Sequence, residues 1–269
     1  MILPNFYTIN KIVKEKKWNH SIVLQAAYDR GALIDENKNL LRKFINHSKK
    51  FDVIPSQLYQ DVFASLIVGD KFDKTFLEFG ATNGLELSNS FYLETFFNWN
   101  GVLAEPDTKW LPELKKNRPE TEIVNKCVWS ESGKKLNFWS SGIGELSTIN
   151  DFKENDIKFY PGNVVNRNKT GENIIVDTIS LNDLIKIKFK SKCPSYISID
   201  TEGSEFDILK NFNFRDFKPI VFTIEHSFTE NEFKIEKLME TNGYLRIFKN
   251  LTLFDCWYVQ NEALPFIEG

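Results

Sequence analysis

The sequence predicts an α/β fold with one open, mostly parallel sheet of seven strands that ends in an antiparallel hairpin. From about residue 75 onward, short apolar runs alternate with helical stretches, which is the pattern of parallel strands joined by crossover helices. Two closing runs, Leu245–Lys249 and Leu253–Val259, are separated by a short turn and predict the hairpin. The first seventy residues space their apolar side chains by three and four, which predicts helices.

The remaining elements follow in chain order from their apolar runs and helical periods. The strands expected before the hairpin are Thr75–Phe79, Gly101–Glu105, Ile123–Val128, Ile174–Ile179, Tyr196–Asp200 and Pro219–Glu225. The helices expected between the strands are Leu87–Trp99, Asp107–Asn117, Leu181–Phe189, Glu205–Phe212 and Glu230–Asn242. We therefore divide the chain into an N-terminal helical cap, residues 1–70, and a larger α/β domain, residues 71–269.

A long polar stretch interrupts this alternation at about residues 137–170. It is rich in Asn, Gly, Ser and Lys. Ordered insertions of this length usually serve function, so one expectation is a lid or a wall beside the substrate. A tolerated surface loop is the alternative, and the sequence leaves both open.

Composition and charge narrow the classes of function. Lys and Arg number 34 and Asp and Glu 37, so the net charge of −3 offers no general attraction for nucleic acid. Three cysteines, Cys127, Cys193 and Cys256, are widely spaced without a CxxC pair, which indicates reduced core residues rather than a zinc or redox site. No apolar run suits a signal peptide or a membrane span, so we expect a cytoplasmic protein.

The loop after the first expected strand carries the first functional signal. In FLEFGATNGLE, residues 76–86, Gly80 and Gly84 allow the backbone to approach a ligand closely and to adopt positive φ. Glu78 precedes the end of an apolar strand, where a carboxylate needs hydrogen bonds or a positive ligand to offset its burial.

Two cofactors compete for this loop. The segment Gly80-Ala81-Thr82-Asn83-Gly84 lacks the G-x-G-x-x-G spacing of NAD sites. S-Adenosylmethionine has no phosphate and carries an amine and a sulfonium, so acidic neighbours suit it better. Glu105, at the end of the second strand, can accept hydrogen bonds from ribose hydroxyls in either class of site.

At this point three stretches resemble a known family. FLEFGATNGLELSNSFYLETFFNWNGVLAEPDTKW, NKCVWSESGKKLNF and YISIDTEGSEFDIL are similar to the FkbM-type methyltransferases, which use S-adenosylmethionine and mostly methylate hydroxyl groups of sugars and related natural products. The resemblance extends from about Ser56 to Val259, and the D-x-E-G-x-E segment from Asp200 to Glu205 is its most specific part. Glu78 departs from the common Asp, and Thr201 from a common apolar residue.

The resemblance implies a Rossmann-like class I methyltransferase sheet and a set of cofactor contacts. The residues implied to bind the cofactor are Glu78, Gly80, Ala81, Asn83 and Gly84 in the loop, Glu105 and Pro106 at the ribose, and Cys127 and Val128 at the adenine.

Carboxylates also end two later strands. Asp200 ends one, and Glu225 ends the next, followed by His226. Ligands of an open α/β sheet lie beyond the carboxyl ends of the strands, so these groups are our candidate catalytic residues, together with Glu202.

Two mechanisms fit such a site. In the first, Asp200 or His226 takes the proton of the acceptor hydroxyl directly. In the second, Asp200 and Glu225, with Glu202 as a further candidate ligand, hold a divalent cation such as Mg²⁺, which prefers hard oxygen ligands. We favour the direct base slightly, because the ligand set is incomplete.

These observations predict an S-adenosylmethionine-dependent O-methyltransferase that acts on a hydroxyl of a sugar, a glycan precursor or a related metabolite. Amine methyltransferases usually use an Asn/Asp-Pro-Pro-aromatic loop, and no Pro-Pro pair occurs in the chain. The alternatives are a non-catalytic binding or scaffold module and a nucleic-acid methyltransferase, which the charge disfavours.

Overall fold

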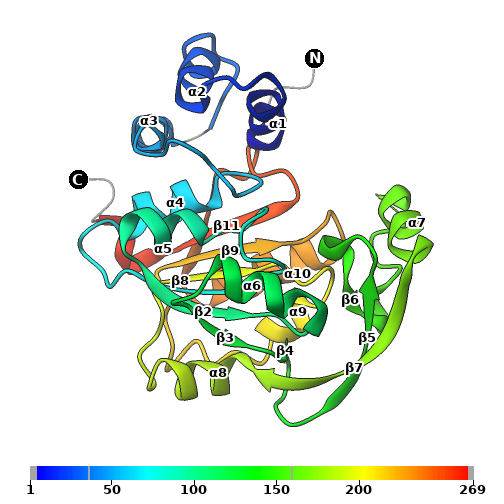
Figure 1. The fold of residues 1–269 in the computed structure, drawn as a ribbon. Helices are drawn as coiled ribbons and strands as arrows, with labels where there is room; N and C mark the ends of the chain where they lie inside the picture. The colour runs from blue at the N-terminus through cyan, green and yellow to red at the C-terminus, as the bar shows by residue number, and fades with distance from the viewer. Residues whose placement is uncertain (1–4, 36, 159, 266–269) are drawn as a thin grey trace.

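The computed structural model describes residues 5–35, 37–158 and 160–265 of the chain. Its main sheet has seven strands in the order β10-β11-β9-β8-β1-β2-β3 (Figure 1). These strands are β1 (Thr75–Phe79), β2 (Asn100–Ala104), β3 (Glu122–Val124), β8 (Tyr196–Ile199), β9 (Val221–Glu225), β10 (Tyr244–Ile247) and β11 (Asp255–Gln260). The predicted strand at Thr75–Phe79 has the predicted bounds.

The main sheet is mixed. Its central pairings, β3 with β2, β2 with β1, β1 with β8 and β8 with β9, are parallel. Strand β11 runs antiparallel to both β9 and β10, which confirms the predicted hairpin. Because of these pairings and of a second sheet, the prediction of one mostly parallel sheet of seven strands needs correction.

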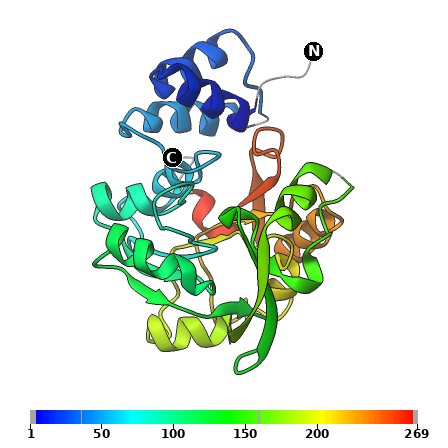
Figure 2. The ribbon, with the colours of Figure 1, turned by 45° about the vertical axis from the view of Figure 1, so that its right-hand side comes forward.

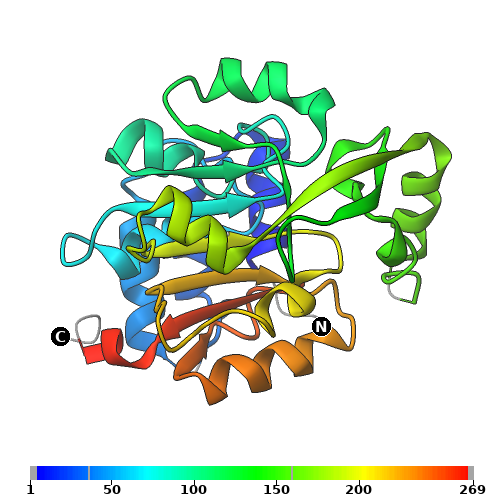
Figure 3. The ribbon, with the colours of Figure 1, turned by 90° about the horizontal axis from the view of Figure 1, so that it is seen from below.

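The second sheet has four strands in the order β4-β7-β5-β6. They are β4 (Cys127–Trp129), β5 (Lys135–Ser141), β6 (Thr148–Ile149) and β7 (Gly171–Ser180). The strand expected at Ile174–Ile179 lies here, and the one expected at Ile123–Val128 is split between β3 and β4. With α7 (Pro161–Lys169), this sheet projects to one side of the main sheet (Figure 3).

The helices that connect the strands lie within or near the predicted ranges, although several are shorter than predicted. They are α5 (Phe91–Phe97), α6 (Leu111–Asn117), α8 (Leu181–Lys188), α9 (Glu205–Leu209) and α10 (Asn231–Thr241). In α8, Ser180 accepts the backbone N–H of Asp183, and this cap begins the helix directly after β7.

The N-terminal segment is helical, as predicted. It contains α1 (Phe6–Lys16), α2 (His20–Asp29), α3 (Lys38–Ser48) and α4 (Gln60–Val68). An asparagine side chain caps each of the first three helices by accepting a backbone N–H three residues later. Helices α1 to α3 gather above the main sheet, with α4 between them and the strands (Figures 1 and 2).

Aromatic packing joins the N-terminal helices to the sheet. The ring of Phe6 stacks on Phe44 and on Trp257 of β11, with centroid distances of 4.9 and 5.6 Å. Phe63 of α4 also stacks on Trp257, with a centroid distance of 4.6 Å. Burial of these large rings stabilises the position of α1 against the sheet.

Candidate active site

A cavity of about 880 Å³ opens at the carboxyl edge of β1, β2, β8 and β9. Because these four strands are parallel, their last residues meet at one edge. The predicted site residues that line the cavity are Glu78, Gly80, Ala81, Asn83, Glu105, Pro106, Cys127, Val128, Asp200, Glu202 and Glu225. The two that do not line it are Gly84 and His226.

Gly80 lies where β1 touches the backbone of the loop after β8. Its φ is +78°, and a Cβ at this position would lie 2.0 Å from the carbonyl oxygen of Asp200. Only glycine fits this contact without displacing the main chain. The backbone of Asp200 is therefore placed directly against the cofactor loop.

Gly84 serves packing rather than the cavity. A Cβ there would lie 2.5 Å from Cδ1 of Leu114 and 2.8 Å from Cγ of Arg118. Its φ of +74° also requires the left-handed region. Gly84 therefore packs the loop closely against Leu114 and Arg118 and does not line the cavity, and its contact with the cofactor stays a prediction.

Glu78 is buried and holds the following loop in place. Its carboxylate accepts hydrogen bonds from the backbone N–H of Asn89 at 2.8 Å and from the hydroxyls of Ser88 at 3.0 Å and Ser90. Arg118, which is also buried, donates to the same Ser90 hydroxyl at 3.0 Å. These donors offset the cost of burying the carboxylate.

Glu105 clamps the cofactor loop to the end of β2. Its two oxygens accept the backbone N–H groups of Thr82 and Asp107, each at 2.8 Å. Burial raises the pKa of the Glu105 carboxyl to about 7, against the lowering effect of these two hydrogen bonds. Each oxygen keeps a lone pair that can accept a hydroxyl of a ribose.

An apolar wall continues from Glu105. Cys127 and Val128 of β4 are buried and line the cavity. Burial raises the pKa of the Cys127 thiol to about 12, so it stays neutral and serves as a small apolar group. Phe138 of β5 lines the same cavity. It was not predicted as a site residue, because it lies in a polar stretch of the sequence.

Three carboxyl groups converge at the ends of β8 and β9. Oxygens of Asp200, Glu202 and Glu225 lie within 4.8 Å of one another. Burial raises the pKa of Asp200 to about 6, although a hydrogen bond with Glu225 acts in the opposite direction. Burial and the charge of Asp200 raise the pKa of Glu225 well above its usual range, which favours the protonated form of Glu225.

Glu202 is paired with a buried arginine of the insertion. Nη2 of Arg167 lies 2.7 Å from Oε2 of Glu202, and Nη1 lies 2.7 Å from Oδ1 of Asp156. The guanidinium also donates to the carbonyl oxygens of Leu146 and Lys153, each at 2.8 Å. Glu202 therefore ties the insertion to the loop after Asp200, and its part in catalysis stays a prediction.

We expect Arg167→Met to lower the free energy of unfolding by about 3–5 kcal/mol, because it leaves two buried carboxylates without their cation. Urea denaturation measures this loss, and adding Glu202→Gln to Arg167→Met should recover part of it. Lys135→Met is the control, since the pair of Lys135 with Asp177 is 72% and 58% exposed. It should change stability by less than about 1 kcal/mol. Equal effects of both variants would contradict the structural importance of Arg167.

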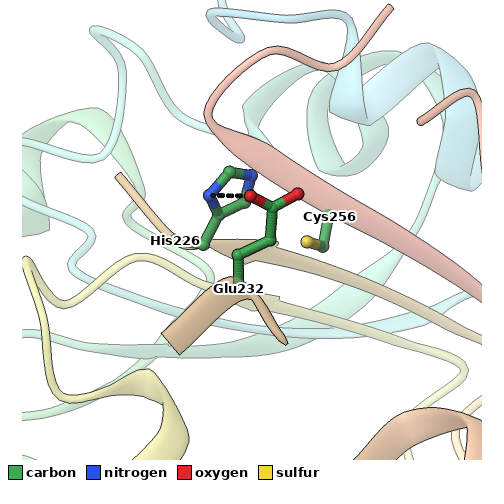
Figure 4. Close-up of side chains that lie close together, drawn as sticks. All are labelled: His226, Glu232 and Cys256. Carbon is green, nitrogen blue, oxygen red and sulfur yellow. Dashed lines mark ion pairs between the residues drawn. The ribbon is translucent and has the colours of Figure 1, made fainter. Parts of the chain in front are cut away.

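His226 lies outside the cavity, next to Glu232 of α10 and Cys256 of β11 (Figure 4). Its Nδ1 accepts the backbone N–H of Phe228 at 3.1 Å and lies 3.8 Å from Oε2 of Glu232. Burial lowers the pKa of the His226 imidazole to about 4, so the ring is neutral at physiological pH. The structure thus removes the geometric basis for His226 as a base toward a substrate in the cavity.

The mixed α/β sheet, with a cavity beyond the carboxyl ends of its parallel strands, is an arrangement compatible with a methyltransferase. The chain belongs to the FkbM methyltransferase family, whose domain model, described as the methyltransferase FkbM domain, matches residues 78–252. The search of curated proteins found no match. Among the described residues, no helix combines the length and the apolarity needed to cross a membrane.

Two crystal structures show a distant likeness. A precorrin-6y C5,15-methyltransferase from Geobacter metallireducens is 14% identical, with a TM-score of 0.39 over 72% of this chain and 75% of that chain. A candidate caffeoyl-CoA O-methyltransferase from Staphylococcus aureus is 13% identical, with a TM-score of 0.42 over 89% of this chain and 99% of that chain. At these TM-scores, neither likeness carries an argument about activity.

S-Adenosylmethionine is the cofactor of this family, and the residues present fit it. The backbone at Gly80 lines the cavity, and Glu105 offers acceptors for ribose hydroxyls. Cys127, Val128 and Phe138 line the cavity with apolar groups, which suits the apolar faces of adenine. The acidic groups beyond them suit an amine and a sulfonium.

Proposed function

We propose that the protein transfers a methyl group from S-adenosylmethionine to a hydroxyl of a sugar, a glycan precursor or a related metabolite. The observation that carries this proposal is the pair of Asp200 and Glu225, which lines the same cavity as Gly80, Glu105 and Cys127. This arrangement supports a methyl acceptor over β8 and β9 and a cofactor over β1 and β2.

When bound, the cofactor supplies a methyl group on a positively charged sulfur. Asp200 accepts the proton of the acceptor hydroxyl as the oxygen attacks, so that the proton ends on the Asp200 carboxylate. The protonated Glu225 donates a hydrogen bond to Asp200 and fixes the direction of that carboxylate. A base with a pKa of about 6 is well matched to proton transfer near neutral pH.

The insertion forms part of the wall of this site. Phe138, Leu146, Ile149 and Tyr160 all line the cavity, which supports the interpretation of residues 137–170 as a substrate wall rather than a tolerated loop. Such a wall restricts water around the reacting groups. The division of the chain at residue 70 stays a prediction.

A divalent cation on Asp200 and Glu225 is the alternative mechanism. The distances among the three carboxyl groups would suit Mg²⁺. Arg167 already neutralises Glu202, however, and the hydrogen bond between Asp200 and Glu225 implies a shared proton. We therefore favour direct proton transfer to Asp200.

Calorimetry with S-adenosylmethionine and with S-adenosylhomocysteine tests the proposal first. Transfer of a labelled methyl group to a panel of hydroxyl compounds, with and without EDTA, then tests the reaction. Undiminished transfer in EDTA would support the direct base. Absence of binding for both cofactor forms would remove the proposal and would favour a scaffold function instead.

The rate of methyl transfer should rise with pH through about 6. Asp200 is protonated below its pKa of about 6 and cannot then accept the proton of the hydroxyl. We expect kcat/KM to fall roughly tenfold per pH unit below that value and to level off above it. Measurement of kcat/KM from pH 5 to 8 checks this, and a flat profile would exclude Asp200 as the base.

A further inference from the structure

Part of the cavity wall comes from residues outside the segment that matches the family. Tyr7 and Lys14 of α1 line the cavity, as do Pro55 and Gln57 of the connection between α3 and α4. The family model begins only at residue 78. These residues therefore belong to a part of the site that the matched domain model does not cover, although Gln57 falls within the wider resemblance that begins at about Ser56.

This N-terminal wall lies on the side of Glu225, away from Glu105. The ring of Tyr7 contacts Phe254 edge-on at 5.5 Å, just before β11. Nε2 of Gln60 donates to Oδ2 of Asp255 at 3.1 Å, and Asp255 is the partner of Glu225 in the β11–β9 pairing. Since β9 and β2 are separated by β8 and β1, the N-terminal wall borders the acceptor half of the cavity.

Hydrogen bonds fix the N-terminal wall in place. Nδ2 of Asn10 donates to the carbonyl oxygens of Ser56 at 2.8 Å and Gln57 at 3.1 Å. Nζ of Lys14 donates to the carbonyl oxygen of Pro55 at 3.2 Å. Ser56 also forms a parallel bridge with Leu87, next to the cofactor loop. The wall is thus ordered before any ligand binds, which lowers the entropic cost of binding.

A second tyrosine approaches from the insertion. Tyr160 lines the cavity, and its ring lies 5.7 Å from that of Phe228. Burial raises the pKa of the Tyr160 hydroxyl, and electrostatic interaction with the side chains of Glu225 and Tyr7 raises this pKa further. Tyr160 and Tyr7 therefore line one cavity together with Glu225, although one comes from the insertion and the other from α1.

The charges of the cavity indicate what these tyrosines bind. Among the described residues, the cavity wall carries two lysines and seven acidic side chains. Of the seven, Glu225 favours its protonated form and Glu202 is paired with Arg167, which leaves five acidic groups against two lysines. One of the lysines, Lys14, is already bonded to main-chain carbonyls. A phosphate or a carboxylate on the acceptor would therefore meet repulsion. An uncharged sugar ring can place its C–H face on tyrosine and its hydroxyls on amides.

We propose that Tyr7, Gln57 and Tyr160 form an acceptor subsite that binds an uncharged sugar ring beside Glu225. The N-terminal helical segment then determines which hydroxyl compound is methylated, while the matched segment holds the cofactor. This inference rests on the proposed function, because it assigns the acceptor of the same reaction.

Binding of neutral methyl glycosides in the presence of S-adenosylhomocysteine tests the subsite. The probes are the methyl glycosides of glucose, galactose, mannose, rhamnose and fucose, followed by saturation-transfer NMR. The variants are Tyr7→Ala, Tyr160→Ala and the ring-preserving Tyr7→Phe. Lys11→Ala is the matched control, since Lys11 is exposed on α1 and does not line the cavity. Calorimetry with S-adenosylhomocysteine on each variant verifies that the fold and the cofactor site are intact.

We expect at least one glycoside to bind the unmodified protein and Lys11→Ala equally well. Its affinity should fall roughly tenfold in Tyr7→Ala and in Tyr160→Ala, and much less in Tyr7→Phe, with cofactor affinity unchanged. Glucose 6-phosphate should not bind. If the cofactor product binds but none of the glycosides does, or if both alanine variants bind the glycoside normally, the subsite is refuted. Failure of the cofactor product itself to bind would instead overturn the proposed function, and this inference with it.

Discussion

Replacement of Asp200 by asparagine is expected to lower the rate of methyl transfer by roughly 10²–10⁴-fold, the usual worth of a general base. Asparagine keeps the shape of the side chain but cannot accept the proton of the hydroxyl. Cofactor affinity should change little, because the contact between Gly80 and residue 200 is made by the backbone carbonyl. Single-turnover transfer of a labelled methyl group measures the rate, and calorimetry measures the affinity.

Two further variants make this result specific. Asp177→Asn is the control, since Asp177 lies on β7 with its side chain 58% exposed and should leave the rate unchanged. Glu225→Gln should lower the rate far less than Asp200→Asn, because glutamine still donates a hydrogen bond where Glu225 is protonated. Comparable losses in both variants would favour a cation held by the two carboxylates. Full activity of Asp200→Asn would exclude Asp200 as the base.

Gly80→Ala is expected to have the second large effect. The added methyl would strain a backbone with φ +78° and would lie 2.0 Å from the carbonyl oxygen of Asp200. We expect a loss of about 2–5 kcal/mol in the free energy of unfolding, from strain and overpacking together. Because the loop and Asp200 must move apart, cofactor affinity should also fall, which calorimetry can measure.

Gly133→Ala is the control that separates the cost of backbone strain at positive φ from the cost of the contact with Asp200. Gly133 has a nearly identical φ of +77°, but a Cβ there meets no atom within 4 Å. It should cost only the strain, about 1–2 kcal/mol, with normal cofactor affinity. Similar losses of stability and of cofactor affinity in the two variants would show that the contact between residue 80 and Asp200 contributes to neither.

Much of the main sheet could be predicted because its strands are short apolar runs buried on both faces. The five residues of β1 are an example, with four buried in succession. The second sheet was predicted only in part: the strand expected at Ile174–Ile179 lies in β7, whereas β5, which is half polar, was missed. Polar strands of this kind have the composition of loops, so residues 137–170 were taken as one insertion without strands.

The site residues were predictable where an ionisable side chain lies at the carboxyl end of an apolar strand, as Asp200 and Glu225 do. His226 illustrates the limit of that reasoning. Neighbouring side chains of an extended strand point to opposite sides, so Glu225 and His226 cannot both face the cavity. The contribution of Tyr7 depends on the packing of α1 against β11, which no local pattern in the sequence reveals.

The hydrogen bonds of Arg167 also bear on which step limits the rate of turnover. Its guanidinium has five N–H groups, and all five donate to fixed partners, namely Leu146, Lys153, Asp156 twice and Glu202. Four of these bonds lie within the insertion and make it one rigid unit, and the bond to Glu202 ties that unit to the loop after β8, which opposes a hinged opening. We therefore expect spent cofactor to leave through a permanently accessible mouth, with product escape fast and the chemical step setting kcat. A pre-steady-state burst of methylated product would show the reverse.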